Sequence, residues 1–218
     1  MIKTVIFDMD GVIVDTEPVH YFAYHQQFKQ LNIEVSDALY RTFTGNSTRN
    51  VFQKLKEIYQ LPQDVEDLIQ VKRNLFNEAF DTKKDLHLIE GVENLIIDLY
   101  NNDLQLILAS SASKVTIDRV FKRFGLDHYF SEKISGEDFE HSKPHPAIFE
   151  HAASLSHFSK EHCVVIEDST NGIEAAVKAN LYCIGYDSFN SKDQDLSKAN
   201  LIIKNFEELN AHFIKGLK

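Results

Sequence analysis

The chain of 218 residues has little cysteine, little positive charge and no long apolar run. Its two cysteines, Cys163 and Cys183, each lie within an apolar run, so we expect reduced core residues and neither a disulfide nor a metal pair. The 23 Lys and Arg residues are outnumbered by 33 Asp and Glu residues, which gives a formal net charge of -10. This charge argues against a nucleic-acid partner, because a phosphate backbone is bound through clustered Lys and Arg side chains.

No apolar stretch approaches the roughly 20 residues that a helix needs to cross a bilayer. From Met1 the sequence runs directly into a predicted strand, without the pattern of a signal peptide. We therefore expect no membrane partner and a cytoplasmic protein, either a monomer or a weak dimer. With 43% hydrophobic residues the chain can bury a full core, and its length favours one domain with a sizeable insertion.

Apolar residues are spaced differently in two unequal blocks of the chain. Between residues 17 and 80 they recur only at helical spacing, which predicts a small helical bundle. After residue 86, helical patterns alternate with short apolar runs, which predicts a parallel sheet with helices on both faces. We expect strands over 4–7, 104–109, 163–166, 181–185 and 201–203, and helices over 91–101, 114–124, 147–155 and 172–179.

The first predicted strand lies far along the chain from the other strands of its sheet. We therefore expect residues 1–15 and 86–218 to form one α/β domain, a doubly wound parallel sheet, and residues 16–85 to form an all-helical insertion. A parallel sheet turns the carboxyl ends of all its strands toward one edge, which is where open α/β sheets keep their ligands. Polar residues that follow different strands can converge there.

Asp8 and Asp10 follow the first apolar run, Thr4–Phe7. Two carboxylates so close repel each other, and in a partly dehydrated cleft a cation or a retained proton relieves that repulsion. A cation would leave one Asp as an oxygen ligand and nucleophile, and a retained proton would make the other a general acid. A solvated strand end whose acidic residues cap the next turn is the alternative that the pair alone leaves open.

Ser110 and Ser111 follow the predicted strand 104–109. They offer a hydroxyl group and backbone N–H groups close to a helix start, which is a ready anion site. Because Ser113 is the better-placed N-cap for that helix, Ser110 is left to bind a ligand.

Two further segments add charge to this edge. Lys143 stands between Ser142 and Pro144, and alone it would more often be a solvated charge. Glu167 and Asp168 follow the strand 163–166 and would serve equally well as helix caps or as metal ligands. Taken together, four carboxylates, a hydroxyl group and a lysine on one rim predict a site for a hard cation such as Mg²⁺ and for a phosphoryl group.

These segments carry a resemblance to a known family. The chain is identified as a member of the haloacid dehalogenase superfamily, in the branch that holds small phosphatases and β-phosphoglucomutase, and the resemblance spans almost the whole chain. It implies a Rossmann-like core, and the helical insertion resembles the cap domain of this branch. The segments similar to the four family motifs are Phe7–Thr16, Leu108–Ser110, Ser142–Pro144 and Ile166–Ser169.

The resemblance implies phosphoryl transfer through an aspartyl phosphate. Asp8 would attack phosphorus, and Asp10 would protonate the leaving oxygen and then activate water or a hydroxyl group. Mg²⁺ would be held by Asp8, the carbonyl group of Asp10 and Asp168, with Glu167 assisting directly or through water. Dehalogenation is the weaker alternative, because the second aspartate is present.

The phosphoryl oxygens would be bound by Ser110, the N–H groups around Ser111 and Lys143. In the cap, the resemblance suggests His20 and Arg49 as substrate-binding residues, with the Lys72-Arg73 pair as another cationic grip for a second phosphate. A His at a solvated helix start and an exposed face for the Lys-Arg pair are the alternatives.

We expect a Mg²⁺-dependent phosphatase that acts on a small phosphorylated metabolite, with a sugar phosphate favoured. The first alternative is β-phosphoglucomutase, which would share every core residue. The spacing from Gly45 to Arg49 is one residue longer than that enzyme leads us to expect, which counts against a mutase. A signalling module that is phosphorylated on aspartate is the second alternative, and the long helical insertion counts against it.

Overall fold

The computed structural model describes residues 1–188 and 192–217. The chain divides into two compact units. One unit joins Met1–Asp15 to His87–Lys218, and the other is Thr16–Leu86. In the described part of the chain, no helix is long and apolar enough to cross a membrane.

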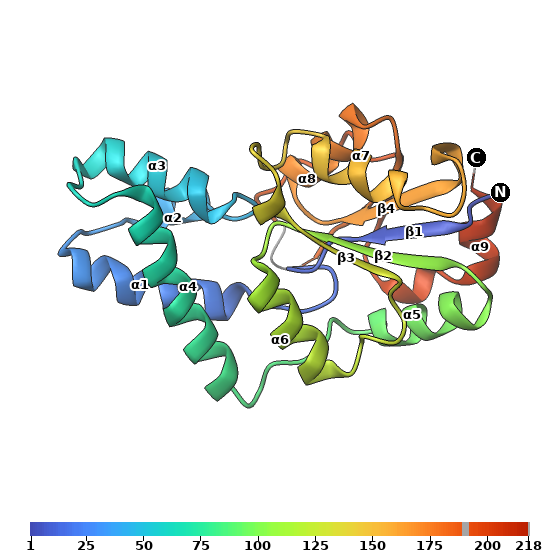
Figure 1. The fold of residues 1–218 in the computed structure, drawn as a ribbon, viewed down its shortest axis with the longest axis horizontal. Helices are drawn as coiled ribbons and strands as arrows, with labels where there is room; N and C mark the ends of the chain where they lie inside the picture. Colours follow the sequence, from blue (N-terminus) through green and yellow to red (C-terminus); the bar gives the residue numbers. More distant parts are fainter. Residues whose placement is uncertain (189–191, 218) are drawn as a thin grey trace. The chain divides into compact units, whose positions relative to one another are not determined.

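The first unit is built on a six-stranded sheet in the order β3-β2-β1-β4-β5-β6 (Figure 1). All neighbouring strands are parallel, which confirms the predicted α/β class. The strand order reverses beside β1, since β2 and β3 lie on one side of it and the later strands on the other. Such a reversal opens a crevice at the carboxyl ends of the strands. The strands are β1 (Thr4–Phe7), β2 (Gln105–Ser110), β3 (Glu132–Ser135), β4 (Cys163–Glu167), β5 (Tyr182–Tyr186) and β6 (Leu201–Ile203).

Helices cover both faces of this sheet. Helices α7 and α8 lie over one face, and α5, α6 and α9 lie over the other (Figure 1). The central strands β1 and β4 are buried at every position, and all their residues except Thr4 and Glu167 are apolar. The helices are α5 (Val92–Asn101), α6 (Lys114–Phe124), α7 (Ala147–Ser154), α8 (Thr170–Lys178) and α9 (Ala211–Gly216), with short 3₁₀ helices η1 (Gly136–Asp138), η2 (Lys160–His162) and η3 (Phe206–Glu208).

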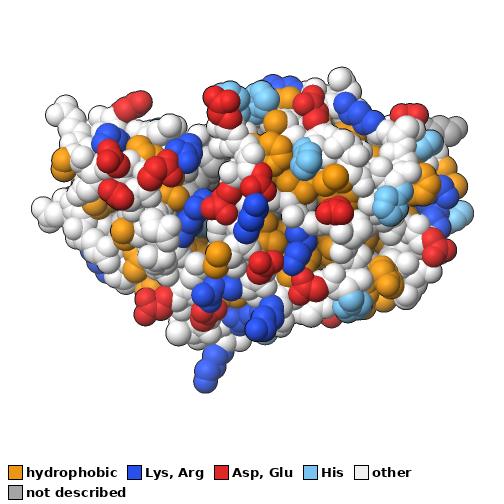
Figure 2. Space-filling model, viewed as in Figure 1, with side chains coloured by type: hydrophobic (Ala, Val, Ile, Leu, Met, Phe, Trp, Pro, Cys, Tyr) orange, Lys and Arg blue, Asp and Glu red, His pale blue; other side chains and the backbone are white. Residues whose placement is uncertain are grey.

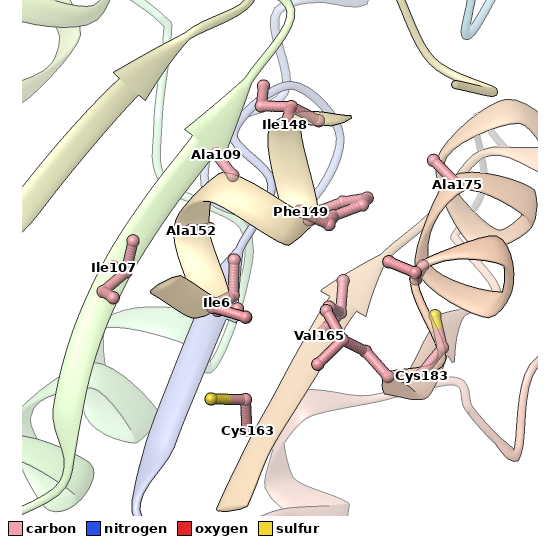
Figure 3. Close-up of a cluster of buried hydrophobic side chains, with 14 of the residues drawn as sticks. Ile6, Ile107, Ala109, Ile148, Phe149, Ala152, Cys163, Val165, Ala175 and Cys183 are labelled. Carbon is pink, nitrogen blue, oxygen red and sulfur yellow. The ribbon is translucent and has the colours of Figure 1, made fainter. Parts of the chain in front are cut away.

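A close-packed apolar cluster fixes α7 and α8 on the sheet. Ile6 of β1, Ile107 of β2 and Val165 of β4 meet Phe149 of α7 in this cluster (Figure 3). Cys163 and Cys183 are free and buried, as predicted, and the figure shows the first of them among these side chains. The packing holds the three central strands rigidly, and with them the residues at their carboxyl ends.

The second unit is helical, and the described residues between 17 and 80 contain no strand, as the sequence predicted. Helices α1 and α4 pack against each other, and buried aromatic and aliphatic side chains fill the unit. The amide of Gln27 on α1 donates to the Leu68 carbonyl of α4 at 2.8 Å. The helices are α1 (Glu17–Leu31), α2 (Asp37–Arg41), α3 (Thr48–Tyr59) and α4 (Val65–Thr82).

Three elements of the first unit were missed or misplaced, and one of them is helix α9 (Ala211–Gly216), which was not predicted. Strand β3 was not predicted, because it is a short edge strand whose first two residues, Glu132 and Lys133, are exposed. Helix α8 begins at Thr170, two residues before the predicted start, because Ser169 is the N-cap and accepts the N–H of Gly172. The remaining predicted strands and helices agree with the structure to within one residue at each end.

Candidate active site

Three neighbouring strands carry polar residues to the same edge of the sheet. Phe7 is level with Leu108 of β2 and with Ile166 of β4, so Asp8 follows its strand at the height where β2 and β4 end. The main-chain N–H of Asp8 donates to the Ile166 carbonyl at 3.0 Å, which extends the pairing of β1 with β4 by one residue. Parallel pairing therefore brings together the residues that the sequence placed at separate strand ends.

Lys143 lies at the centre of this edge and is almost completely buried, with 4% of its side chain exposed. Its Nζ donates to Asp8 Oδ1 at 2.5 Å, to Glu167 Oε1 at 2.9 Å and to the Ala109 carbonyl at 3.1 Å. The ammonium group also lies 4.6 Å from the centre of the Phe149 ring, which is within cation–π distance. Lys143 is therefore a fixed cation among carboxylates.

Protein donors surround the carboxylate of Glu167. Its Oε1 accepts from Lys143, and its Oε2 accepts from the main-chain N–H groups of Asp168 and Ser169 at 2.9 and 2.8 Å and from the Ser169 hydroxyl at 2.9 Å. Gly172 makes room for it, because a Cβ atom at that position would lie 1.7 Å from Oε1. Glu167 thus holds Lys143 in place, and its predicted role as a metal ligand stays a prediction.

The buried carboxylates have more negative charge than one lysine can balance. Burial raises the pKa of Asp8 from 3.8 to about 7, against the attraction of Lys143 and together with repulsion from Glu167 and Asp10. Burial and the neighbouring carboxylates also raise the pKa of Asp168 well above its usual range. For Lys143 burial alone would lower the pKa, but the charges of Asp8 and Glu167 outweigh it and the net direction is upward. The lysine stays charged, while the carboxylates favour a proton or a further cation.

Gly11 allows Asp168 to approach the loop that follows β1. Its φ is +86°, and a Cβ atom there would lie 2.1 Å from Asp168 Oδ2. Both the backbone conformation and the space therefore require glycine. In the same loop the N–H of Gly11 donates to the Val14 carbonyl at 2.9 Å, and Asp10 pairs with Val14 in an isolated bridge. The tight turn keeps Asp10 close to the end of β1.

The segment Ser110–Ser113, here called the anion loop, joins β2 to α6. Ser113 is the N-cap of α6, as predicted, and accepts the N–H of Thr116 at 3.2 Å. The buried Ser110 Oγ accepts the N–H of Ala112 at 3.0 Å, which leaves its hydroxyl hydrogen as a donor. Ser111 is exposed at the helix start. The loop therefore offers an O–H group and a helix N-terminus. It begins next to Lys143, because the Ala109 carbonyl group, one residue before the loop, accepts from Lys143 Nζ.

The donor set at this edge fits a hard cation. Among the described residues, no three His, Cys, Asp or Glu side chains are grouped so that they could ligate one ion by themselves. The set implied by the resemblance has two side-chain carboxylates, Asp8 and Asp168, and one main-chain carbonyl group, that of Asp10. Carboxylate and carbonyl oxygens are the ligands that Mg²⁺ prefers, and water completes its coordination in most proteins. The repulsion between the buried carboxylates gives such an ion a favourable field.

The predicted cap residues lie in the helical unit. His20 Nδ1 is 2.7 Å from Lys72 Nζ, and Lys72 lies 4.7 and 4.8 Å from the ring centres of Tyr24 and Phe76. Lys72 is buried, so the interpretation of an exposed helix face was wrong for this residue. Arg49 is half-exposed and forms an ion pair with Glu66. His20 and Arg49 stay predictions as substrate contacts.

Several residues that build the site had no signal in the sequence. The Ala109 carbonyl group accepts from Lys143, and a main-chain acceptor cannot be recognised from its side chain. Phe149 lies in the predicted helix 147–155, and nothing in the sequence signals its contact with Lys143. Ser169 did have a signal in the sequence, because a Ser directly before a helix start is a typical N-cap.

The comparisons with known proteins agree with this arrangement. Residues 5–186 match the family model described as haloacid dehalogenase-like hydrolase. The match covers most of the chain, so the chain belongs to the haloacid dehalogenase-like hydrolases. Its relatives include β-phosphoglucomutases and small phosphatases. The resemblance seen in the sequence is thereby confirmed.

Three relatives illustrate the range of this branch. A phosphorylated carbohydrates phosphatase of Thermotoga maritima is 27% identical over 82% of each chain. A crystal structure of β-phosphoglucomutase from Clostridium difficile is 27% identical, covers 99% of this chain and 96% of its own, and has a TM-score of 0.84. The structure of CbbY from Rhodobacter sphaeroides in complex with phosphate covers both chains completely, with a TM-score of 0.89 at 24% identity, and supports the fold.

Proposed function

We propose that the chain is a Mg²⁺-dependent phosphatase that transfers the phosphoryl group of a sugar phosphate to Asp8 and then to water. The observation that carries this proposal is the contact of the buried Lys143 with both Asp8 and Glu167 at the carboxyl edge of the sheet. A buried cation beside a carboxylate at a strand end fits an anionic substrate better than it fits a purely structural role. Membership of the hydrolase family supports the reaction class.

Asp8 and Asp10 divide the chemistry between them. A carboxylate oxygen of Asp8 attacks phosphorus, the bond from phosphorus to the ester oxygen breaks, and Asp10 gives its proton to that oxygen. In the second half, Asp10 takes a proton from water, the water oxygen attacks phosphorus, and the bond to Asp8 breaks. Inorganic phosphate leaves, and both aspartates return to their starting states.

Lys143, Ser110 and the N–H groups around Ser111 bind the phosphoryl oxygens in this proposal. The charge of Lys143 and the donors of the anion loop stabilise the negative charge that the transition state redistributes over those oxygens. Glu167 positions Lys143. Its Oε1 accepts from the lysine, and its Oε2 is fixed by the main-chain N–H groups of Asp168 and Ser169. Removal of Glu167 would leave the lysine free to move away from Asp8.

Asp8, Asp168 and the Asp10 carbonyl group would hold Mg²⁺. When bound, the ion neutralises carboxylate and phosphoryl charge, so that one anion can approach another. With the ion bound, Asp8 would be ionised, whereas the metal-free site favours its protonated form. The direction of the Asp8 pKa shift therefore supports a requirement for the ion.

The test measures inorganic phosphate released from a panel of sugar phosphates in the presence of Mg²⁺. We expect multiple turnovers by the parent and none by Asp8→Asn, while Asp103→Asn, a control at an exposed position, keeps the parental rate. Stoichiometric phosphorylation without turnover would instead favour an aspartate-phosphorylated signalling module. An Asp8→Asn variant that hydrolyses esters as fast as the parent would contradict the proposal.

β-Phosphoglucomutase remains the second candidate, because a solved enzyme of that name matches almost the whole chain. A mutase would pass the phosphoryl group back to a sugar hydroxyl group instead of to water. Conversion of β-glucose 1-phosphate with a trace of a bisphosphate primer, faster than release of inorganic phosphate, would favour the mutase. Release of phosphate from several sugar phosphates without isomerisation would favour the phosphatase.

A further inference from the structure

The junction between β3 and η1, Ser135–Glu137, packs against the anion loop from outside the site. Ser135 is level with Ser110 in the parallel pairing of β3 with β2. The three residues Ser135, Gly136 and Glu137 each make a different contact with the anion loop or with the start of α6. None of them has a part in the chemistry proposed above.

Ser135 fixes the main chain of the anion loop. Its side chain is buried, and its Oγ donates to the Ala112 carbonyl at 2.7 Å. The N–H group of Ala112 in turn donates to Ser110 Oγ at 3.0 Å. Ala112 is therefore held through both its N–H and its carbonyl group, one by a residue of the site and the other by β3.

Gly136 sets how closely the two segments approach. A Cβ atom at this position would lie 3.0 Å from Ser111 Cα, 3.4 Å from the Ser111 carbonyl oxygen and 3.5 Å from the Ser110 carbonyl oxygen. All three are main-chain atoms, which cannot swing aside as a long side chain can. Any larger residue must push the backbone of Ser111 and Ser110 by a few tenths of an ångström.

Glu137 connects the junction to helix α6. Its Oε2 accepts the main-chain N–H of Lys114 at 2.9 Å, and this N–H belongs to the first turn, where helical partners are missing. Its own N–H donates to Ser135 Oγ at 3.2 Å. The hydroxyl group of Ser135 therefore connects η1 to the anion loop, and both ends of that loop are fixed.

We propose that Ser135 and Gly136 are positioning residues for phosphoryl binding, which they serve by holding the anion loop at the distance from Asp8 that the phosphoryl group requires. This inference rests on the proposed function. Phosphoryl oxygens are bound through short, directional hydrogen bonds, so a loop displaced by a few tenths of an ångström binds them less well. The residues do not touch the substrate.

The test compares two serine variants that lose the same kind of bond. Ser135→Ala removes a hydroxyl-to-carbonyl hydrogen bond between β3 and the chain after β2. Ser131→Ala removes a matching bond, from Ser131 Oγ to the Leu106 carbonyl at 3.2 Å, just before β3 and away from the anion loop. Each variant is assayed for KM, for kcat and for competitive inhibition by inorganic phosphate.

We expect Ser135→Ala to raise KM and the inhibition constant of phosphate together by about 3- to 10-fold, which is the effect of one hydrogen bond. Its kcat should change less than KM. Gly136→Ala should raise both constants further, Ser135→Thr should restore much of the loss, and Ser131→Ala should leave both constants at the parental values.

Parental constants in Ser135→Ala would overturn the inference, and so would equal changes in the Ser131 and Ser135 variants, which would indicate a general loss of stability. These outcomes differ from failure of the proposed function. That failure would appear in the parent itself, as no release of phosphate or as turnover that survives Asp8→Asn. A parent whose turnover depends on Asp8, with a Ser135→Ala variant of unchanged KM, refutes the inference alone.

Discussion

Replacing the proposed nucleophile should stabilise the metal-free protein while abolishing its activity. In Asp8→Asn the side chain keeps its shape but cannot ionise. Asp8 is buried beside Lys143, Glu167 and Asp10, and its environment disfavours its charge despite the lysine. Because the asparagine has no charge to bury, the folded state loses an unfavourable interaction that the unfolded state never had.

The size of the effect follows from the pKa of Asp8. A rise from 3.8 to about 7 means that ionised Asp8 costs the folded protein about 4 kcal/mol at pH 8 relative to an exposed aspartate. Part of the stability gained by removing this cost is lost again in the variant, because the hydrogen bond from Lys143 to an asparagine is weaker by about 1–2 kcal/mol than one to a carboxylate. We expect a net gain of about 2 kcal/mol in the free energy of unfolding.

The gain should depend on pH in a defined direction. Between about pH 4 and pH 7 the folded parent retains a proton on Asp8 that the unfolded chain has released. The folded state then binds more protons, so the parent loses stability as the pH rises through this window. The stability of the asparagine variant does not fall in this way, because its side chain at position 8 does not titrate. The advantage of the variant should therefore grow by about 2–3 kcal/mol between pH 5 and pH 8.

Urea unfolding at pH 5 and pH 8 in the presence of EDTA measures this difference, and Asp103→Asn at an exposed position serves as the matched control. Added Mg²⁺ should stabilise the parent more than Asp8→Asn, because the variant lacks a carboxylate ligand. The electrostatic reasoning would be refuted by a variant that is less stable than the parent at pH 8 in EDTA. A difference that stays constant from pH 5 to pH 8 would refute it as well.

Three further predictions concern Gly172, Gln27 and Lys143. In Gly172→Ala, the new methyl group overlaps the Glu167 carboxylate, so urea unfolding should show a loss of about 3–5 kcal/mol and phosphatase turnover should fall. Gln27→Leu should change the free energy of unfolding by less than about 1 kcal/mol, because relief of the buried Gln27 Oε1, which accepts no hydrogen bond from the described residues, is offset by loss of the Gln27 amide bond to the Leu68 carbonyl. Lys143→Arg should lower kcat about 100-fold at unchanged charge, because a planar guanidinium group cannot reproduce the ammonium geometry; turnover within threefold of the parent would contradict this.

Local signals were sufficient for some elements, and helix α6 is the best example. Helix α6 was predicted to the residue, because Ser113 caps its first turn and Gly125 ends it with a φ of +68°. Strand β3 had no such signal. Only Ile134 and Ser135 of its four residues are buried, and a short half-exposed run is indistinguishable from a loop until its pairing with β2 is known. Pairing partners distant in sequence decide such a segment.

The same distinction applies to the candidate site. The rule that parallel strand ends converge was enough to group Asp8 with Glu167. Lys143 was predicted at the same edge although it follows no predicted strand, and the structure places it beside both carboxylates. The rule could not identify the Ala109 carbonyl group as the third acceptor of Lys143, nor the contact of Ser135 with the anion loop. Both depend on where the main chain runs after a strand ends, and that path is set by packing between elements.

Lys143 has three hydrogen-bond acceptors, and together they hold its positive charge among the carboxylates of the site. An ammonium group has three N–H donors, and in this structure three acceptors lie within reach of Lys143, two of them carboxylates on different strand ends. In the substrate-free protein all its donors are thus engaged by these acceptors, one of which a phosphoryl oxygen would replace, and the cation cannot leave without exposing two buried carboxylates to each other. Asp168 is not among the three acceptors, and burial, together with repulsion from the neighbouring carboxylates, raises its pKa despite the attraction of Lys143. A second cation held by Asp8 and Asp168 would complete the charge balance.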